Sequence, residues 1–88
     1  MNVAARDLIQ SHVMVDWKDY IEEKPEVMLG KPSFKGTRIT VEHVLRELGG
    51  GMSEAQLLAA HPRLSGEHIR AAMLYAAAVI DLEQMVAP

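Results

Sequence analysis

Three helices are predicted by the apolar residues that surround Thr40, Ser53 and Ser65. Each of these hydroxyl residues has an apolar neighbour one position before it and another four positions after it, which is the pattern of an N-cap with a hydrophobic staple. The stapling pairs are Ile39 with Val44, Met52 with Leu57, and Leu64 with Ile69. A hydroxyl oxygen at such a start accepts a hydrogen bond from a backbone N–H group that has no partner inside the helix. We therefore expect a helix to begin after each of the three.

The first two predicted helices are short and have clear ends. The first covers residues 41–48, where apolar side chains recur at the i, i+3, i+4 and i+7 positions of one face. Three consecutive glycines, residues 49–51, stop it because glycine readily adopts left-handed conformations. The second covers residues 54–60, with Gln56 completing a capping box and Pro62 blocking its continuation.

The third predicted helix begins at residue 66 or 67 and extends to Met85. One of its faces is expected to lie in the core and consists of Ile69, Ala72, Met73, Ala76, Val79, Ile80 and Glu83. A second apolar stripe is too large for two short helices to cover. Either the N-terminal segment up to Trp17 folds back on it or a second chain does, and the sequence leaves both possibilities open. The candidate partner or dimer interface residues in this stripe are Leu74, Tyr75, Ala78, Leu82 and Met85.

The residues that precede the first helix predict short extended segments. Residues 20–23 and 32–39 are candidates for a small hairpin or ribbon, since two prolines and two glycines in this region exclude a long helix. Farther upstream, residues 2–12 can form a helix with Asn2 as its cap, inside an N-terminal extension that covers residues 1–18.

A single domain is expected at residues 19–88, with short β segments and a loop at 19–40 and a three-helix unit at 41–88. A chain of 88 residues has too little surface to bury for a second core. The fold class predicted is mainly α. The order of helix, turn, helix, turn and longer helix is the outline of a trihelical helix-turn-helix domain, homeodomain-like or winged-helix-like, preceded here by a small β-hairpin or ribbon.

The composition fits packed helices in a soluble protein. Apolar residues make up 49% of the chain but aromatic residues only 5%, so the core is expected to consist mainly of aliphatic side chains and Met. The chain has no cysteine and no positively charged segment followed by an apolar one at its start. Its longest apolar run, residues 71–80, is shorter than the about 20 residues that a membrane span needs. We expect a cytoplasmic protein without membrane association.

The charge distribution singles out one stretch of the chain. A net charge of −3 argues against a protein that coats nucleic acid through bulk electrostatics. Residues 31–46 nevertheless carry four cations, and Glu42 is the single acidic residue among them. Such cations either contact a partner or are simply solvated. Within the helix-turn-helix interpretation, the candidate DNA-binding residues are Lys35, Arg38, Arg63, Ser65, His68 and Arg70.

Catalytic and metal chemistry are not indicated by the sequence. The histidines, His12, His43, His61 and His68, fall at no recognised metal-ligand spacing, and no cysteine or acidic pair accompanies them. The glycine- and lysine-containing loop at residues 30–38 lacks the spacing of a phosphate-binding loop. We predict no catalytic residue, no metal and no cofactor, and therefore no enzyme.

Several short motifs resemble a known family. They are Tyr20-Ile21, the segment PEVMLGKP at residues 25–32, KGTRITV at 35–41, GMSE at 51–54, HPRL at 61–64 and IRAAMLYA at 69–76. Together they are similar to the bacterial and archaeal domain-of-unknown-function family 433, and the resemblance extends over residues 20–77. Residues 1–18 and the tail lie outside it.

This resemblance implies a regulatory function. Members of the family are similar to the VapB-like antitoxins of VapBC-like toxin–antitoxin pairs, are often encoded beside a PIN-like ribonuclease toxin, and are classed with homeodomain-like or winged helix-turn-helix folds. By resemblance, the protein is expected to form a homo-oligomer such as a dimer, to inhibit a PIN-like ribonuclease toxin, and to bind its own promoter or operator DNA. The alternative is a protein-interaction or oligomerisation module that does not bind DNA.

Overall fold

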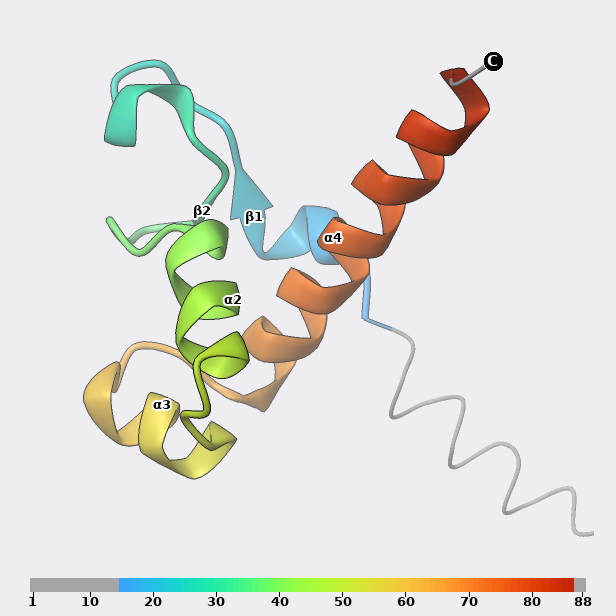
Figure 1. The fold of residues 1–88 in the computed structure, drawn as a ribbon. Helices are drawn as coiled ribbons and strands as arrows, with labels where there is room; N and C mark the ends of the chain where they lie inside the picture. Colours follow the sequence, from blue (N-terminus) through green and yellow to red (C-terminus); the bar gives the residue numbers. More distant parts are fainter. Residues whose placement is uncertain (1–14, 87–88) are drawn as a thin grey trace, which may run out of the picture.

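The computed structural model describes residues 15–86, with side chains as far as residue 83. Along the chain the elements are η1 (Trp17–Asp19), β1 (Ile21–Glu22), η2 (Met28–Gly30), β2 (Ser33–Phe34), α2 (Val41–Gly49), α3 (Glu54–Ala60) and α4 (Gly66–Val86). Figure 1 shows α2 and α3 on one side of the long α4, with the β-strands beside α2. The prediction of a mainly helical domain with a small N-terminal ribbon is confirmed. The helix predicted at residues 2–12 lies outside the described residues.

The predicted helix starts are confirmed, two of them with the expected caps. The Thr40 hydroxyl accepts a hydrogen bond from the His43 N–H at 3.1 Å. The Ser53 hydroxyl accepts from the Gln56 N–H at 3.1 Å while the Gln56 side chain accepts from the Ser53 N–H at 2.9 Å, which completes the capping box. The helix α4 begins immediately after Ser65, as expected.

A tight turn places β2 and α2 on the same side of the core. The strands β1 and β2 pair antiparallel, with Ile21 opposite Phe34. The Thr37 hydroxyl then donates to the Phe34 carbonyl at 2.8 Å and accepts from the Ile39 N–H at 3.0 Å, which closes the turn. Gly36 has a φ of +75°, a left-handed conformation that favours glycine. Much of the KGTRITV motif is therefore explained by turn and cap geometry.

One core joins the ribbon to all three helices. Its fully or almost fully buried residues are Ile21, Phe34, Val41, Val44, Leu57, Leu64, Ile69, Ala71 and Ala72. Phe34, Val44 and Leu57 have no exposed surface, so the strand β2 and the helices α2 and α3 meet at these side chains. Because a small domain has only this one core, its stability depends on a few large side chains.

The predicted core face of α4 is wrong for Met73 and for the second half of the helix. Ile69 and Ala72 are buried as expected, but the exposed fraction is 49% for Met73, 38% for Val79 and 54% for Ile80. For Val79 and Ile80 the physical reason is reach, since the C-terminal turns of α4 run beyond the other elements (Figure 1). This half of α4 therefore leaves apolar surface uncovered by the described residues. No helix among residues 15–86 is both long and apolar enough to span a lipid bilayer.

The η2 segment stores backbone strain at an exposed leucine. Met28 and Leu29 have φ values of +48° and +58°, and the Leu29 side chain is 93% exposed. A left-handed conformation costs a leucine roughly 1–2 kcal/mol, whereas asparagine adopts it more readily. We expect Leu29→Asn to raise the free energy of unfolding by up to about 1 kcal/mol in a urea titration. Leu29→Ala keeps the penalty and serves as the control, and a loss of stability in Leu29→Asn would contradict the strain.

Candidate functional site

An apolar groove lies between α2 and α4. It has a volume of about 420 Å³ and is lined on the α2 side by Val41 and Leu45 and on the α4 side by Tyr75, Val79 and Ile80. Its existence follows from the length of α4, which continues past the point where α2 begins to diverge from it (Figure 1). Contiguous apolar surface of this sort is costly to leave in water and marks interaction sites.

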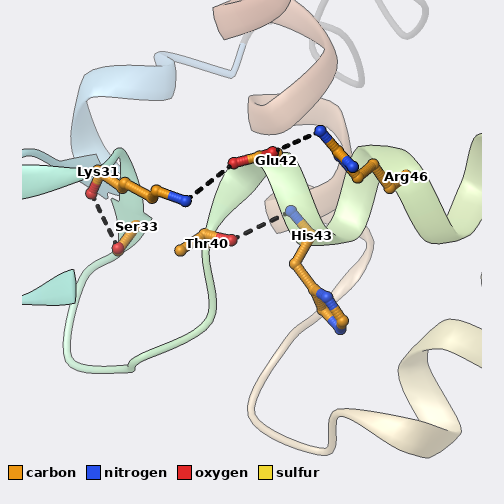
Figure 2. A network of polar contacts seen from close by, with 6 residues as sticks. All are labelled: Lys31, Ser33, Thr40, Glu42, His43 and Arg46. Carbon is orange, nitrogen blue, oxygen red and sulfur yellow. Dashed lines mark hydrogen bonds and ion pairs between the residues drawn. The ribbon is translucent and has the colours of Figure 1, made fainter. Parts of the chain in front are cut away.

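Charged side chains border the groove on its α2 side. Figure 2 shows Glu42 between two cations, with Lys31 Nζ 3.4 Å from Glu42 Oε1 and Arg46 Nη2 2.8 Å from Glu42 Oε2. The Arg46 side chain is 79% exposed, so these pairs contribute little to stability. They leave one net positive charge at the rim, available to an acidic group of a partner.

The predicted interface residues of α4 divide into exposed and partly covered ones. Leu74, Ala78 and Leu82 are exposed, with 39% of Leu74 and 62% of Leu82 accessible. The side chain of Met85 lies outside the described residues. Tyr75 is half-buried, so the predicted alternative of cover from the N-terminal side is realised at this position.

Two neighbours hold Tyr75 in place. The Trp17 ring packs edge-on against the Tyr75 ring at 4.9 Å between centroids, and the Tyr75 hydroxyl donates to Glu23 Oε2 at 2.8 Å. Burial, followed by this hydrogen bond to Glu23, raises the pKa of the Tyr75 hydroxyl to about 12. Tyr75 therefore joins η1 to α4 at one wall of the groove.

The cations of the predicted DNA-binding set are partly brought together. Arg38 and Arg63 line one hollow of about 480 Å³, on the turn before α2 and the turn before α4. Arg63 Nη1 donates to the Gly36 carbonyl at 2.9 Å, which ties the two turns to each other. Lys35 is exposed in the same turn as Gly36, and Arg70 is exposed on the first turns of α4.

Ser65 and His68 interact with each other rather than pointing outward. His68 Nδ1 accepts a hydrogen bond from the Ser65 N–H at 3.0 Å and lies 3.0 Å from the Ser65 hydroxyl. The His68 ring also packs edge-on against Tyr20 and Phe34, at 5.0 and 5.5 Å between centroids. His68 thus caps α4 in the way that a glutamine does in a capping box. These contacts leave neither side chain extended toward a ligand.

His68 is expected to make the domain sensitive to acid. Burial lowers the pKa of His68 below its ordinary value of 6.5, and the nearby Glu67 offsets this in part. The unfolded chain then binds more protons than the folded protein does. The contribution of His68 to the free energy of unfolding is therefore present above pH 6.5 and is lost as the pH falls through the folded pKa. Urea titrations between neutral and mildly acidic pH should show a shallower pH dependence for His68→Gln, which keeps an acceptor but does not titrate. Equal slopes in both proteins would contradict this role.

A third group of side chains meets where α3 ends against α2. His43 Nε2 and His61 Nε2 lie 3.1 and 2.9 Å from the same Glu47 Oε1 atom. The sequence predicted no acidic pair beside the histidines, and these two meet a single glutamate. The available signal was the i, i+4 spacing of His43 and Glu47, which places both on one face of a helix. The approach of His61, fourteen residues beyond Glu47, depends on the tertiary fold and has no local signal.

These features define a small, mainly helical domain with an N-terminal β-ribbon, an apolar groove and a pair of arginine-bearing turns. A family model described as "Protein of unknown function (DUF433)" matches residues 21–76. The chain belongs to this family, as its motifs predicted.

Two individual proteins show the same relationship. Uncharacterized protein y4eO of Sinorhizobium fredii (strain NBRC 101917 / NGR234) is 34% identical over 61 residues, which are 69% of this chain and 28% of that protein. The chain thus spans little more than a quarter of that relative's length. The crystal structure of a DUF433 member from Anabaena variabilis ATCC 29413 matches with a TM-score of 0.62 at 21% identity, covering 100% of this chain and 87% of the other. That structure shares the fold.

Proposed function

We propose that this protein is a non-enzymatic, antitoxin-like regulator that binds and inhibits a PIN-like ribonuclease toxin. The observation that carries the proposal is the uncovered apolar surface of α4. The C-terminal turns of this helix run beyond the other elements of the domain, and its exposed apolar side chains are Leu74, Val79, Ile80 and Leu82. An apolar helix face of this kind gains most of its binding free energy when a partner removes it from water.

The groove beside this face supports a protein as the ligand. An extended or helical segment of a partner fits between Leu45 and Ile80 and excludes water from both. The exposed cations Lys31 and Arg46 at the rim complement acidic groups, which PIN-like nucleases carry in clusters. The similarity to antitoxins that the family motifs imply supports the proposal of a nuclease of this class.

Binding to the operator DNA is the second part of the proposed function. In a helix-turn-helix arrangement of α2, α3 and α4, the first turns of α4 face the major groove and the neighbouring turns contact phosphates. Arg38 and Arg63 lie in one hollow of the surface, with Lys35 exposed nearby, and these three supply the phosphate contacts. Arg70 is the exposed cation on the proposed recognition helix itself.

Fluorescence anisotropy with the upstream DNA of the gene tests this second part. We expect binding that weakens with salt, with a logarithmic slope that falls by about 0.9 for each phosphate contact removed, as in Arg38→Ala. Arg46→Ala is the matched control, because it removes an arginine at the apolar groove between α2 and α4. Absence of binding by the wild type at low salt would reject the DNA contact. An affinity and a salt slope of Arg38→Ala equal to those of the wild type would reject the role of this arginine.

A protein-interaction or oligomerisation module without DNA binding is the second candidate function. It is favoured by the same apolar face of α4 and needs none of the cations. Both candidates allow self-association, which sedimentation equilibrium of the wild type and Ile80→Asp measures. Fluorescence anisotropy with the upstream DNA distinguishes them, because this module should show no DNA binding even at low salt.

A further inference from the structure

We propose that His43, Glu47 and His61 form a binding site for a divalent transition-metal ion, with Zn²⁺ the ion that best fits the donors. The proposal is independent of the regulatory function above. Two imidazoles and one carboxylate are a donor set that Zn²⁺ binds in proteins, with a further position left for water or another ligand. The three side chains each offer one ligand atom, and these atoms lie within 4.8 Å of one another.

Two of the three distances between ligand atoms are close to those around a bound ion, and all three are within 4.8 Å. Zinc–nitrogen and zinc–oxygen bonds of about 2.0–2.2 Å place the ligand atoms of a tetrahedral site roughly 3.3 Å apart. The two nitrogens lie 3.1 and 2.9 Å from Glu47 Oε1, so they need to separate from it by only a few tenths of an ångström. Rotation about side-chain torsions supplies such a change without moving the backbone.

The backbone already fixes the positions of all three residues. His43 and Glu47 are one turn apart on α2, and the His43 N–H is held by the Thr40 cap. His61 ends α3, with its N–H donating to the Leu57 carbonyl at 2.9 Å and Pro62 following it. The ligands thus come from two helices of the same core, which is the arrangement that reduces the entropic cost of binding an ion.

The site is sheltered on one side and open on the other. The side chains of His61 and Glu47 are 19% and 23% exposed, whereas His43 is 54% exposed. Figure 2 shows the His43 ring on the side of α2 away from Glu42, so the cluster is separate from the ion pairs of the apolar groove. A hollow of about 300 Å³ borders His43 and His61, and Arg38 lines it as well. An ion there has room for a water molecule or an anionic ligand.

Hydrogen bonding alone is the competing explanation of the cluster. An imidazole nitrogen that donates its proton to Glu47 can bind a metal only after that proton has left it. Glu47→Gln separates the two explanations. The glutamine oxygen still accepts from an imidazole N–H, but an uncharged amide is a poor ligand for Zn²⁺.

Isothermal titration of the chelator-treated full chain with ZnCl₂ tests the proposal. We expect one ion per chain, no heat with MgCl₂, and an affinity at least about 100-fold weaker in both Glu47→Gln and His61→Ala. Glu42→Gln, which changes the other glutamate of α2, is the matched control and should bind as the wild type does. Circular dichroism confirms that each variant is folded.

Two results would overturn the metal site. The first is the absence of saturable one-to-one binding by the wild type. The second is equal affinity in the wild type, Glu47→Gln and His61→Ala, which identifies an adventitious ion only. Visible absorption of the Co²⁺ complex provides a separate readout, since the bands expected for nitrogen and oxygen ligands should be lost in His61→Ala.

Discussion

Phe34→Ala is expected to lower the free energy of unfolding by about 3–5 kcal/mol, which is typical when a buried phenylalanine is truncated to alanine. Phe34 has no exposed surface, and its ring contacts the His68 ring at 5.5 Å between centroids. Loss of the ring leaves a cavity where β2, α2 and α4 meet. Stabilities of about 0.05–0.15 kcal/mol per residue are typical, so a domain of 88 residues has little margin.

Urea denaturation followed by circular dichroism measures this loss. Phe34→Leu retains most of the apolar volume and should cost less than half as much. Lys35→Ala, at the neighbouring exposed position, should change stability by no more than about 0.5 kcal/mol. A Phe34→Ala protein as stable as the wild type would show that this side chain does not hold the ribbon and the helices together.

Ile80→Asp is expected to weaken partner binding by at least about 30-fold, which corresponds to about 2 kcal/mol. The side chain is 54% exposed in the free protein, so the substitution removes apolar contact area and places a charge in the interface without opening the core. Leu74→Asp, at a side chain that is 39% exposed, should act in the same direction. Titration calorimetry with the purified partner measures both effects.

The control for these two variants is Ala55→Asp. Ala55 is exposed on the first turn of α3, where an added carboxylate favours the helix, and it lies away from the groove. It adds the same charge and should bind as the wild type does. Binding reduced equally by Ala55→Asp and Ile80→Asp would show that net charge, and not the α4 face, determines the affinity.

The helices were predictable because their starts are encoded locally. Thr40 and Ser53 cap as their neighbours indicate. The helix α2 ends within the glycine triplet, at Gly49, one residue later than predicted, and α3 ends two residues before Pro62. The ribbon was predictable only as a tendency. Its register, Ile21 opposite Phe34, depends on the fold of the connection through η2, which gives no clear local signal in the sequence.

The candidate site was predictable in part, because its elements meet through tertiary packing. The excess of apolar surface on α4 was visible in the helical periodicity, but the division between core and exposed faces was not. That division depends on how far α4 continues past the first turns of α2, which face Ile80 across the groove. The convergence of His61 on Glu47 likewise brings together two helices. The role of His68 was hidden, because a histidine at a helix start has the same sequence pattern whether it caps or faces a ligand.

The most direct test of the proposed function is an RNA-cleavage assay with the proposed partner, a PIN-like nuclease. We predict that one equivalent of the wild-type protein abolishes cleavage, and that Ala55→Asp does the same. Folded Ile80→Asp should leave cleavage close to the rate of the nuclease alone. A nuclease that cleaves equally with and without the wild-type protein, or that is inhibited equally by Ile80→Asp, would contradict the assignment of α4 as the inhibitory surface.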